Sequence, residues 1–222
     1  MKCMILAAGL GERLRPLTNR TPKPLVKIAG KPLLEHHLEK LKSAGYKEIV
    51  INLSYLGNMI QEQLGRGQRF GIHIEYSNEG KEPLGTAGGI IHALPLLGDD
   101  PFLVINGDTW CEHTLAFPNL PKDKQAHLVL VNNPAHNFNG DFAYEHGKVY
   151  NIGKNFLTYS GIGIYDPKLF KNFSNEKWAL APILHTAIDE QLVGAEHFSG
   201  KWFDIGTLEQ LEQAENYISK IK

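Results

Sequence analysis

The fold is best predicted from one stretch near the start of the chain, Leu6-Ala7-Ala8-Gly9-Leu10-Gly11-Glu12-Arg13-Leu14-Arg15-Pro16-Leu17-Thr18. The apolar run that leads into it, Cys3–Ala7, predicts a buried strand. Glycines placed directly after a strand let the backbone turn sharply and expose its amide N–H groups, which can cradle phosphates. Arg13 adds a planar guanidinium suited to a triphosphate. A Gly-x-Gly pair is also common in plain turns. The loop alone therefore does not decide between a phosphate-binding loop and an ordinary turn.

Two other phosphate-binding loops do not fit this stretch. A dinucleotide fingerprint requires a third glycine, but that position is Leu14, and Arg15-Pro16 follows where a helix should continue. A P-loop requires Gly-Lys-Ser or Gly-Lys-Thr, which does not follow at the right spacing. The loop therefore indicates a nucleotide site of another kind.

The first half of the chain alternates short apolar runs with helical patterns, which is typical of βαβ units and a parallel sheet. Strands are predicted at Cys3–Ala7, Glu48–Leu53, His73–Tyr76 and Phe102–Ile105, and helices from Pro32 to Gly45, at Tyr55–Leu64 and from about Thr86. The second half predicts a more antiparallel lobe, with strands at Ala126–Val131 and Tyr159–Tyr165, a hairpin at Phe142–Val149, and a short strand and turn at Lys201–Gly206. Thr207-Leu208-Glu209-Gln210 resembles a capping box that opens a closing helix.

Composition limits the class of protein. The chain has 222 residues, 42% of them hydrophobic, and a net charge of −1 with scattered basic residues, which argues against a nucleic-acid-binding protein. Cys3 and Cys111 lack metal-type spacing, and the apolar start is too short for a signal peptide. No segment is long and apolar enough to span a bilayer. We expect a soluble, cytoplasmic protein without a membrane or nucleic-acid partner, and its oligomeric state does not follow from the sequence.

A lysine between two prolines follows the glycine loop, in Thr21-Pro22-Lys23-Pro24-Leu25. A stiff backbone suits an ammonium that must be aimed at a phosphate, because orientation carries much of phosphoryl-transfer catalysis. An isolated motif of this kind is more often a solvent-exposed turn. Its position shortly after the glycine loop favours the catalytic interpretation.

Two aspartates are candidate metal ligands. Asp108 follows the apolar strand Phe102–Ile105, at the strand end where open α/β sheets bind ligands. Asp204 lies in an apolar and aromatic run, where a carboxylate is costly unless a cation or hydrogen-bond donors meet it. Mg²⁺ prefers one or two carboxylates together with phosphate oxygens and water. The structural alternatives are a simple turn for Asp108 and a helix-terminus partner for Asp204.

A second glycine-rich turn, Glu82-Pro83-Leu84-Gly85-Thr86-Ala87-Gly88-Gly89, opens a predicted helix. Small residues there let a flat ring approach the backbone closely. Glu82 or a neighbouring carbonyl is a candidate acceptor for the imide N–H of a pyrimidine. An ordinary loop-to-helix junction is the alternative, and the identity of the base does not follow from these residues.

Taken together, Leu-Ala-Ala-Gly-x-Gly-x-Arg, Pro-Leu-Thr and Pro-Lys-Pro-Leu resemble the signature of the sugar-1-phosphate nucleotidyltransferases. The resemblance implies an α/β, Rossmann-like nucleotidyltransferase fold with a central, mainly parallel mixed sheet flanked by helices and a smaller antiparallel sugar-binding lobe. It implies a single domain, in which residues 1–110 mainly bind the nucleotide, 111–200 mainly bind the sugar, and 201–222 carry the second metal aspartate and the closing helix. The implied reaction joins a nucleoside triphosphate to a sugar 1-phosphate with Mg²⁺ and releases pyrophosphate.

The same resemblance assigns roles to individual residues. Lys23, Arg13 and Asp108 are implied to be catalytic, and Asp108 and Asp204 to hold the metal. The implied nucleotide contacts are Leu6, Ala8, Gly9, Gly11, Glu12, Arg13, Lys23, Glu82, Gly85, Thr86 and Gly88. No histidine is needed as a base, because a phosphate monoester is already ionised at neutral pH. We expect His36, His37 and His92 on helix surfaces or in the core.

The segment Asn132–Phe142 is rich in hydrogen-bonding side chains. Its Asn-Pro-x-His followed by Gly-Asp-Phe resembles the subfamily that uridylylates N-acetylmuramate 1-phosphate in peptidoglycan recycling. This resemblance implies UTP as the nucleotide, UDP-N-acetylmuramic acid as the product, and sugar contacts from Asn106, Asp141, Ser160 and Gly161. A transferase for mannose, glucose or glucosamine 1-phosphate and a non-catalytic nucleotide-sugar-binding domain remain alternatives. The Glu-Lys-Pro triplet of many family members is absent, and Lys154 lies in its region in a different context.

Overall fold

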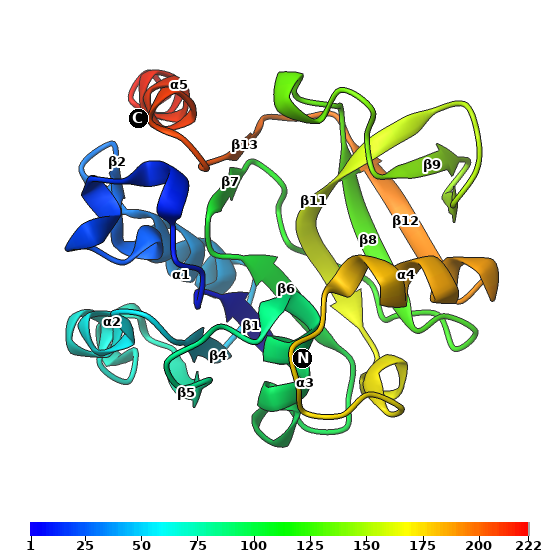
Figure 1. Cartoon of the computed structure of the whole chain (residues 1–222), viewed down its shortest axis with the longest axis horizontal. Helices are drawn as coiled ribbons and strands as arrows, with labels where there is room; N and C mark the ends of the chain where they lie inside the picture. The colour runs from blue at the N-terminus through cyan, green and yellow to red at the C-terminus, as the bar shows by residue number, and fades with distance from the viewer. Residues whose placement is uncertain (222) are drawn as a thin grey trace.

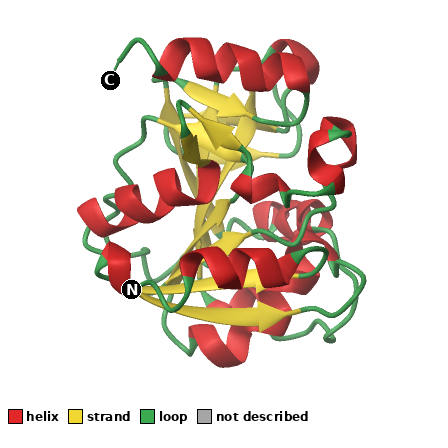
Figure 2. Ribbon diagram, turned by 90° about the vertical axis from the view of Figure 1, so that its left-hand side faces the viewer, coloured by secondary structure: helices red, strands yellow, loops and turns green. Residues whose placement is uncertain are grey.

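A continuous nine-stranded sheet runs through the computed structural model, which describes residues 1–221. Its strand order is β5-β4-β1-β6-β11-β8-β12-β10-β9 (Figure 1). The first four of these strands in that order are parallel, namely β5 (His73–Asn78), β4 (Glu48–Leu53), β1 (Cys3–Leu6) and β6 (Phe102–Asn106). Helices lie on both sides of the strands (Figure 2). The predicted mixed sheet flanked by helices is confirmed.

The two faces of the parallel strands bury different helices. On one face, α1 (Leu33–Ser43) and α2 (Gly57–Leu64) pack against Ile5 and Ile51. On the other face, α3 (Gly85–Leu97) and α4 (Leu180–Asp189) pack against Met4 and Val104. Successive side chains of a strand point to opposite faces, so covering both faces requires the near-continuous apolar runs seen in the sequence.

The second half of the chain extends the same sheet and curls it. The strands are β8 (Ala126–Val131), β9 (Phe142–Glu145), β10 (Lys148–Tyr150), β11 (Phe156–Tyr165) and β12 (Val193–Phe198). The long strand β11 pairs with β6, β8 and β9, so that β11, β8, β12, β10 and β9 close into a ring. The predicted antiparallel lobe is therefore the curled end of one sheet, and it includes a parallel pair, β8 and β12.

Two small ribbons complete the fold. One joins β2 (Lys27–Ile28) to β3 (Lys31–Pro32), and the other joins β7 (Thr109–Cys111) to β13 (Trp202–Asp204). The closing helix α5 (Leu208–Ile218) packs on Ile28 and Ile205. Thr207 caps this helix as predicted, since its hydroxyl oxygen accepts the Gln210 N–H at 3.3 Å. Among residues 1–221, no helix has the length and apolar character needed to cross a membrane.

His37, on α1, lies in the core as expected and is 6% exposed. Its Nε2 has no hydrogen-bond partner among residues 1–221. Burial, with smaller contributions from Lys40 and His36, lowers the pKa of His37 from 6.5 to about 4. The unfolded chain therefore takes up a proton at a higher pH than the folded chain does.

We expect this histidine to weaken the fold in acid. As the pH falls from 6.5 to about 4, protonation favours the unfolded chain, and stability drops by up to about 3 kcal/mol. In a His37→Asn variant, the free energy of unfolding should fall less steeply across this window, measured by urea titration at several pH values. The exposed His73, replaced in the same way, is the control. An unchanged slope in His37→Asn would contradict the assignment.

Candidate active site

The loops that follow β1 and β6 meet at the carboxyl edge of the parallel sheet. The glycine loop follows β1, and Asp108 lies in the turn Gly107-Asp108 between β6 and β7. Strand β13 brings Asp204 to the same place, because it pairs with β7 and sets Asp204 opposite Thr109. The Ile205 N–H also donates to the backbone oxygen of Asp108 at 2.8 Å. Asp204, at the end of β13, is therefore brought next to the turn that carries Asp108.

The glycine loop is held in one conformation by its own contacts. Gly11 has a φ of +65°, and its backbone oxygen accepts the Thr18 hydroxyl at 2.7 Å. A Cβ at Gly11 would lie 2.9 Å from Thr18 Cγ2 and 3.0 Å from Lys23 Cβ. The loop therefore needs glycine here for two reasons, its backbone conformation and its close approach to the Lys23 segment.

We expect Gly11→Ala to destabilise the protein and disturb the cleft. The left-handed conformation alone costs an L-residue about 1–2 kcal/mol, and the contact with Thr18 and Lys23 adds to this. Urea unfolding and nucleotide binding by calorimetry are the measurements. Gly45→Ala is the matched control, because Gly45 also has a positive φ but no atom within 4 Å of the added Cβ. Equal effects of the two substitutions would mean that the close approach does not matter.

Lys23 is pre-positioned beside Asp108. It opens a short 3₁₀ turn, Lys23–Leu25, and is only 9% exposed. Its Nζ donates to Asp108 Oδ2 at 2.5 Å. The proline on each side limits the conformations of this turn, as the sequence predicted. The ammonium therefore already lies inside the site that the three segments build.

Charged side chains surround the Asp204 carboxylate. Burial and the nearby Asp108 carboxylate raise its pKa, while Lys23, His136 and Arg13 favour its ionised form. His136 Nε2 is 3.1 Å from Asp204 Oδ2. Arg13 packs directly on Gly206, where an added Cβ would come within 2.7 Å of its Nη2. Two carboxylates brought together in this way fit a divalent cation, because a cation relieves the repulsion that raises the pKa.

A cavity of about 200 Å³ opens beside these residues. It brings together many of the predicted contacts, Leu6, Ala8, Gly9, Lys23, Gly85, Thr86, Asn106 and Asp108. Gly11, Glu12 and Arg13 lie in the adjoining loop and do not line it. Gly88 lies one turn into α3. The Asp108 wall and the Gly85–Thr86 wall are thus two sides of one cleft.

Sequence analysis missed two residues of this cavity, Asn52 and Glu79. Asn52 Oδ1 accepts the Ala7 N–H at 2.6 Å, and Asn52 Nδ2 donates to Glu79 Oε1 at 2.6 Å. Glu79 Oε2 in turn accepts the Leu84 N–H at 2.7 Å. This network ties the glycine loop to the second glycine-rich turn. Glu82, the predicted acceptor, is exposed and does not line the cavity, whereas Glu79 does.

The glycines at the start of α3 have a structural reason of their own. The segment 176–178 docks onto this turn, where Trp178 N–H donates to the Leu84 oxygen at 3.0 Å and the Trp178 oxygen accepts from Ala87 at 3.1 Å. A Cβ at Gly85 would lie 2.7 Å from the Trp178 oxygen, and one at Gly88 would collide with the Glu176 oxygen. The glycines therefore permit backbone-to-backbone contact as well as access to the cavity.

The predicted sugar contacts lie in different surroundings. Asn106 lines the cavity and packs against Gly161, whose φ is +79°. The Asp141 carboxylate accepts the Tyr159 N–H at 2.7 Å and the Asn137 side-chain amide at 3.0 Å. Ser160 is fully buried and its hydroxyl donates to the Val129 oxygen at 2.7 Å, so this hydroxyl does not face the cleft. Lys154 is exposed between β10 and β11.

Comparisons with known proteins agree with this arrangement. A family model described as Nucleotidyl transferase matches residues 2–136, which include the glycine loop, Lys23 and Asp108. N-acetylmuramate alpha-1-phosphate uridylyltransferase of Neisseria meningitidis serogroup B is 48% identical over 224 residues, covering 97% of each chain. Mannose-1-phosphate guanylyltransferase catalytic subunit beta of Danio rerio is 32% identical over 223 residues, covering 93% of this chain and 61% of that one.

A solved structure has a similar fold. A protein of Bacillus anthracis described as a glucose-1-phosphate thymidylyltransferase, in complex with a sucrose, matches with a TM-score of 0.87 at 25% identity. The match covers 100% of this chain and 96% of that one. The likeness therefore spans the sheet, the curled ring and the segments that build the cleft.

Proposed function

This chain belongs to the nucleotidyl transferase family, and we propose that it transfers the uridylyl group of UTP to N-acetylmuramic acid 1-phosphate. The products are UDP-N-acetylmuramic acid and pyrophosphate. One observation carries the proposal, the 48% identity to the Neisseria meningitidis N-acetylmuramate alpha-1-phosphate uridylyltransferase over 97% of both chains. The site supports it, because a glycine loop, a buried lysine and Asp108 lie at one cavity and the β7–β13 ribbon brings Asp204 next to them.

In this proposal the cavity takes the nucleoside part of UTP. The glycine loop and Arg13 face the triphosphate, and the turn at Gly85 and Thr86 lies beside the base. The network of Asn52 and Glu79 keeps these two loops at a fixed separation. A pocket whose loops are tied together before binding loses less conformational freedom when the nucleotide enters.

A divalent cation, Mg²⁺, completes the proposed site. Asp108 and Asp204 would hold it, and phosphate oxygens would supply further ligands. When bound, Mg²⁺ neutralises phosphate charge and favours the charge distribution of the transition state. Among residues 1–221 no group of three or more His, Cys, Asp and Glu side chains is placed to hold a metal ion, so the proposed site needs the phosphate oxygens as ligands.

The chemical step is an in-line displacement. An oxygen of the sugar phosphate forms a bond to the α-phosphorus, and the bond from that phosphorus to the bridging oxygen of pyrophosphate breaks. No proton has to be removed, because the attacking phosphate is already ionised. Lys23 Nζ leaves Asp108, contacts the α-phosphate and offsets the negative charge that grows on that phosphate. Arg13 and the loop amides offset the charge of the leaving pyrophosphate.

The sugar phosphate would approach from the curled end of the sheet. Asn106 and the peptide at Gly161 lie next to the cavity there, and Asp141 orders the neighbouring loop. We place the reaction in the cytoplasm, in the recycling of peptidoglycan sugars, because UTP is a cytoplasmic substrate and the product is a cell-wall precursor.

The test is pyrophosphate release in Mg²⁺, with UTP, dTTP, GTP and CTP each crossed against N-acetylmuramate, N-acetylglucosamine, glucose and mannose 1-phosphates. Release that is fastest with UTP and N-acetylmuramate 1-phosphate is expected. Release with another pair would keep the transferase mechanism and overturn the substrate. No release with any pair, from folded protein, would favour a binding domain.

A further inference from the structure

A chain of polar contacts connects the closing helix to Asp204. The Gly206 N–H donates to Gln210 Oε1 at 2.9 Å. Gln210 Nε2 lies 2.9 Å from His136 Nδ1, and His136 Nε2 lies 3.1 Å from Asp204 Oδ2. None of these residues except Asp204 was singled out as a site residue by the sequence.

The orientation of the Gln210 amide follows from its contact with Gly206. A backbone N–H can only donate, so the oxygen of the Gln210 amide faces Gly206 and its NH₂ group faces His136. The NH₂ group faces Nδ1, so the imidazole ring is held with its Nε2 edge toward the Asp204 carboxylate, 3.1 Å from Oδ2. A side chain held against a carboxylate in this way can orient that carboxylate as a metal ligand.

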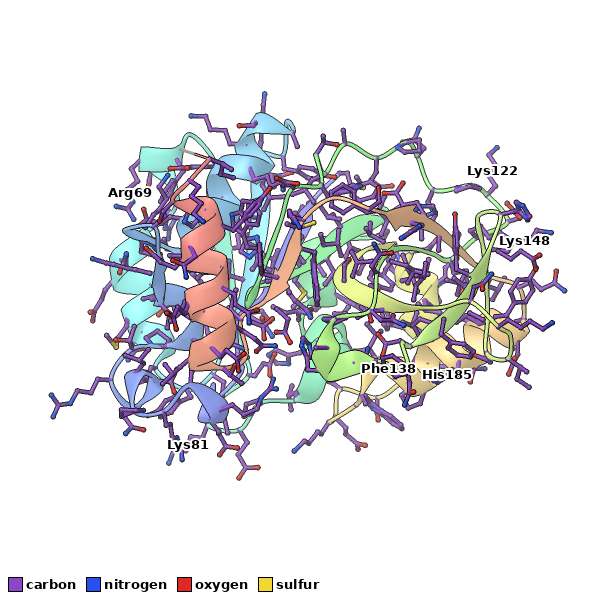
Figure 3. All side chains as sticks on the ribbon, turned by 90° about the horizontal axis from the view of Figure 1, so that it is seen from above. Arg69, Lys81, Lys122, Phe138, Lys148 and His185 are labelled. Atoms are coloured by element: carbon purple, nitrogen blue, oxygen red, sulfur yellow. The ribbon has the colours of Figure 1, made fainter. Side chains whose placement is uncertain are left out.

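His136 is itself held by an ordered loop. It lies in the 3₁₀ turn Ala135–Asn137. Asn137 Nδ2 donates to Asp141 Oδ1 at 3.0 Å and to Thr158 Oγ1 at 3.2 Å, which fixes the turn to β11. Phe138, labelled in Figure 3, follows this turn and is 82% exposed, so apolar packing does not hold the turn in place.

We propose that His136 is a positioning residue that fixes the rotation of the Asp204 carboxylate for the divalent cation. This inference rests on the proposed function. The other groups that act on Asp204 are Asp108, Lys23 and Arg13, and Lys23 is already bonded to Asp108. His136 therefore contacts Asp204 directly, and Gln210 holds the orientation of the His136 ring.

The test measures metal binding directly. Mn²⁺ is titrated by electron paramagnetic resonance into the protein saturated with a non-hydrolysable UTP analogue. His136→Ala is expected to raise the Mn²⁺ dissociation constant about tenfold, and His136→Gln, which keeps an N–H donor near the position of Nε2, only about threefold. His185→Ala is the control, because His185 (labelled in Figure 3) also bonds a side-chain amide, that of Asn151, but lies outside the cleft.

Kinetic and stability measurements complete the experiment. The Mg²⁺ concentration for half-maximal rate should rise with the Mn²⁺ constant, while the melting temperature in EDTA stays close to that of the wild type. An unchanged Mn²⁺ constant in His136→Ala overturns the proposal, and if only the KM for the sugar phosphate then changes, His136 contacts substrate instead. Equal effects of the Ala and Gln variants also overturn it. Absence of pyrophosphate release by the wild type would overturn the proposed function, while the Mn²⁺ titration would still decide the role of His136.

Discussion

Replacing Asp108 by asparagine is expected to lower kcat by at least about a thousandfold, while the chain still folds. The substitution keeps the shape of the side chain but removes the charge that would hold the cation. It also removes the partner of Lys23, whose Nζ lies 2.5 Å from Asp108 Oδ2. In the proposed mechanism both losses act where charge develops in the transition state. Initial rates of pyrophosphate release at saturating UTP and Mg²⁺ measure the effect.

The Asp108 variant needs a folding control, because it leaves a nearly buried lysine without its carboxylate. We expect a lower melting temperature in the free protein and partial recovery when UTP is added, since phosphates then meet Lys23. Asp123→Asn, at an exposed loop position, should change neither rate nor melting temperature. Full activity of Asp108→Asn at ordinary Mg²⁺ concentrations would remove Asp108 from the metal site.

Replacing Lys23 by alanine is expected to lower kcat about 10²–10³-fold, with a much smaller change in the KM for the sugar phosphate. In the proposed mechanism the ammonium contributes most when the α-phosphate gains charge, so its loss acts on the transition state more than on substrate binding. Steady-state kinetics with both substrates varied separates the two parameters.

Two related variants sharpen the Lys23 experiment. Lys27→Ala removes an exposed lysine four positions along the same segment and should leave kcat unchanged. Lys23→Arg keeps the charge but replaces a compact ammonium by a larger, planar guanidinium at a position that is only 9% exposed, so we expect little recovery. A change confined to the KM for the sugar phosphate in Lys23→Ala would contradict the assigned role.

The parts of the fold and site that follow local rules were predictable from the sequence. The strand and glycine loop around Gly11 carry a backbone requirement that only glycine meets easily, and the prolines around Lys23 limit its backbone directly. Asp108 ends an apolar strand, and the edge at which parallel strands end is shared. These signals depend on residues adjacent in the chain, and the mixed sheet that they imply is confirmed.

The parts that depend on distant partners were not predictable. Asn52 and Glu79 come together because β4 and β5 are neighbours in the sheet. The sequence offered one signal for Asn52, a polar side chain near the end of an apolar strand, and none for Glu79. Strand β12 contains Gly194 and Glu196, which weakens its alternating pattern. Helix α4 was also not predicted, although the helical spacing of Leu180, Ile183, Leu184 and Ala187 is a local signal for it.

The small ribbon of β7 and β13 also bears on how the protein reaches its working form. It pairs Thr109 with Asp204, so Asp204 is brought next to the Asp108 turn only through a contact of very long sequence separation. Such contacts form late, because closing a long loop is entropically unfavourable until other structure has brought its ends near. A partly folded chain can therefore present a nucleotide pocket with a single carboxylate. Catalytic competence should appear last during refolding, after nucleotide binding has already been restored.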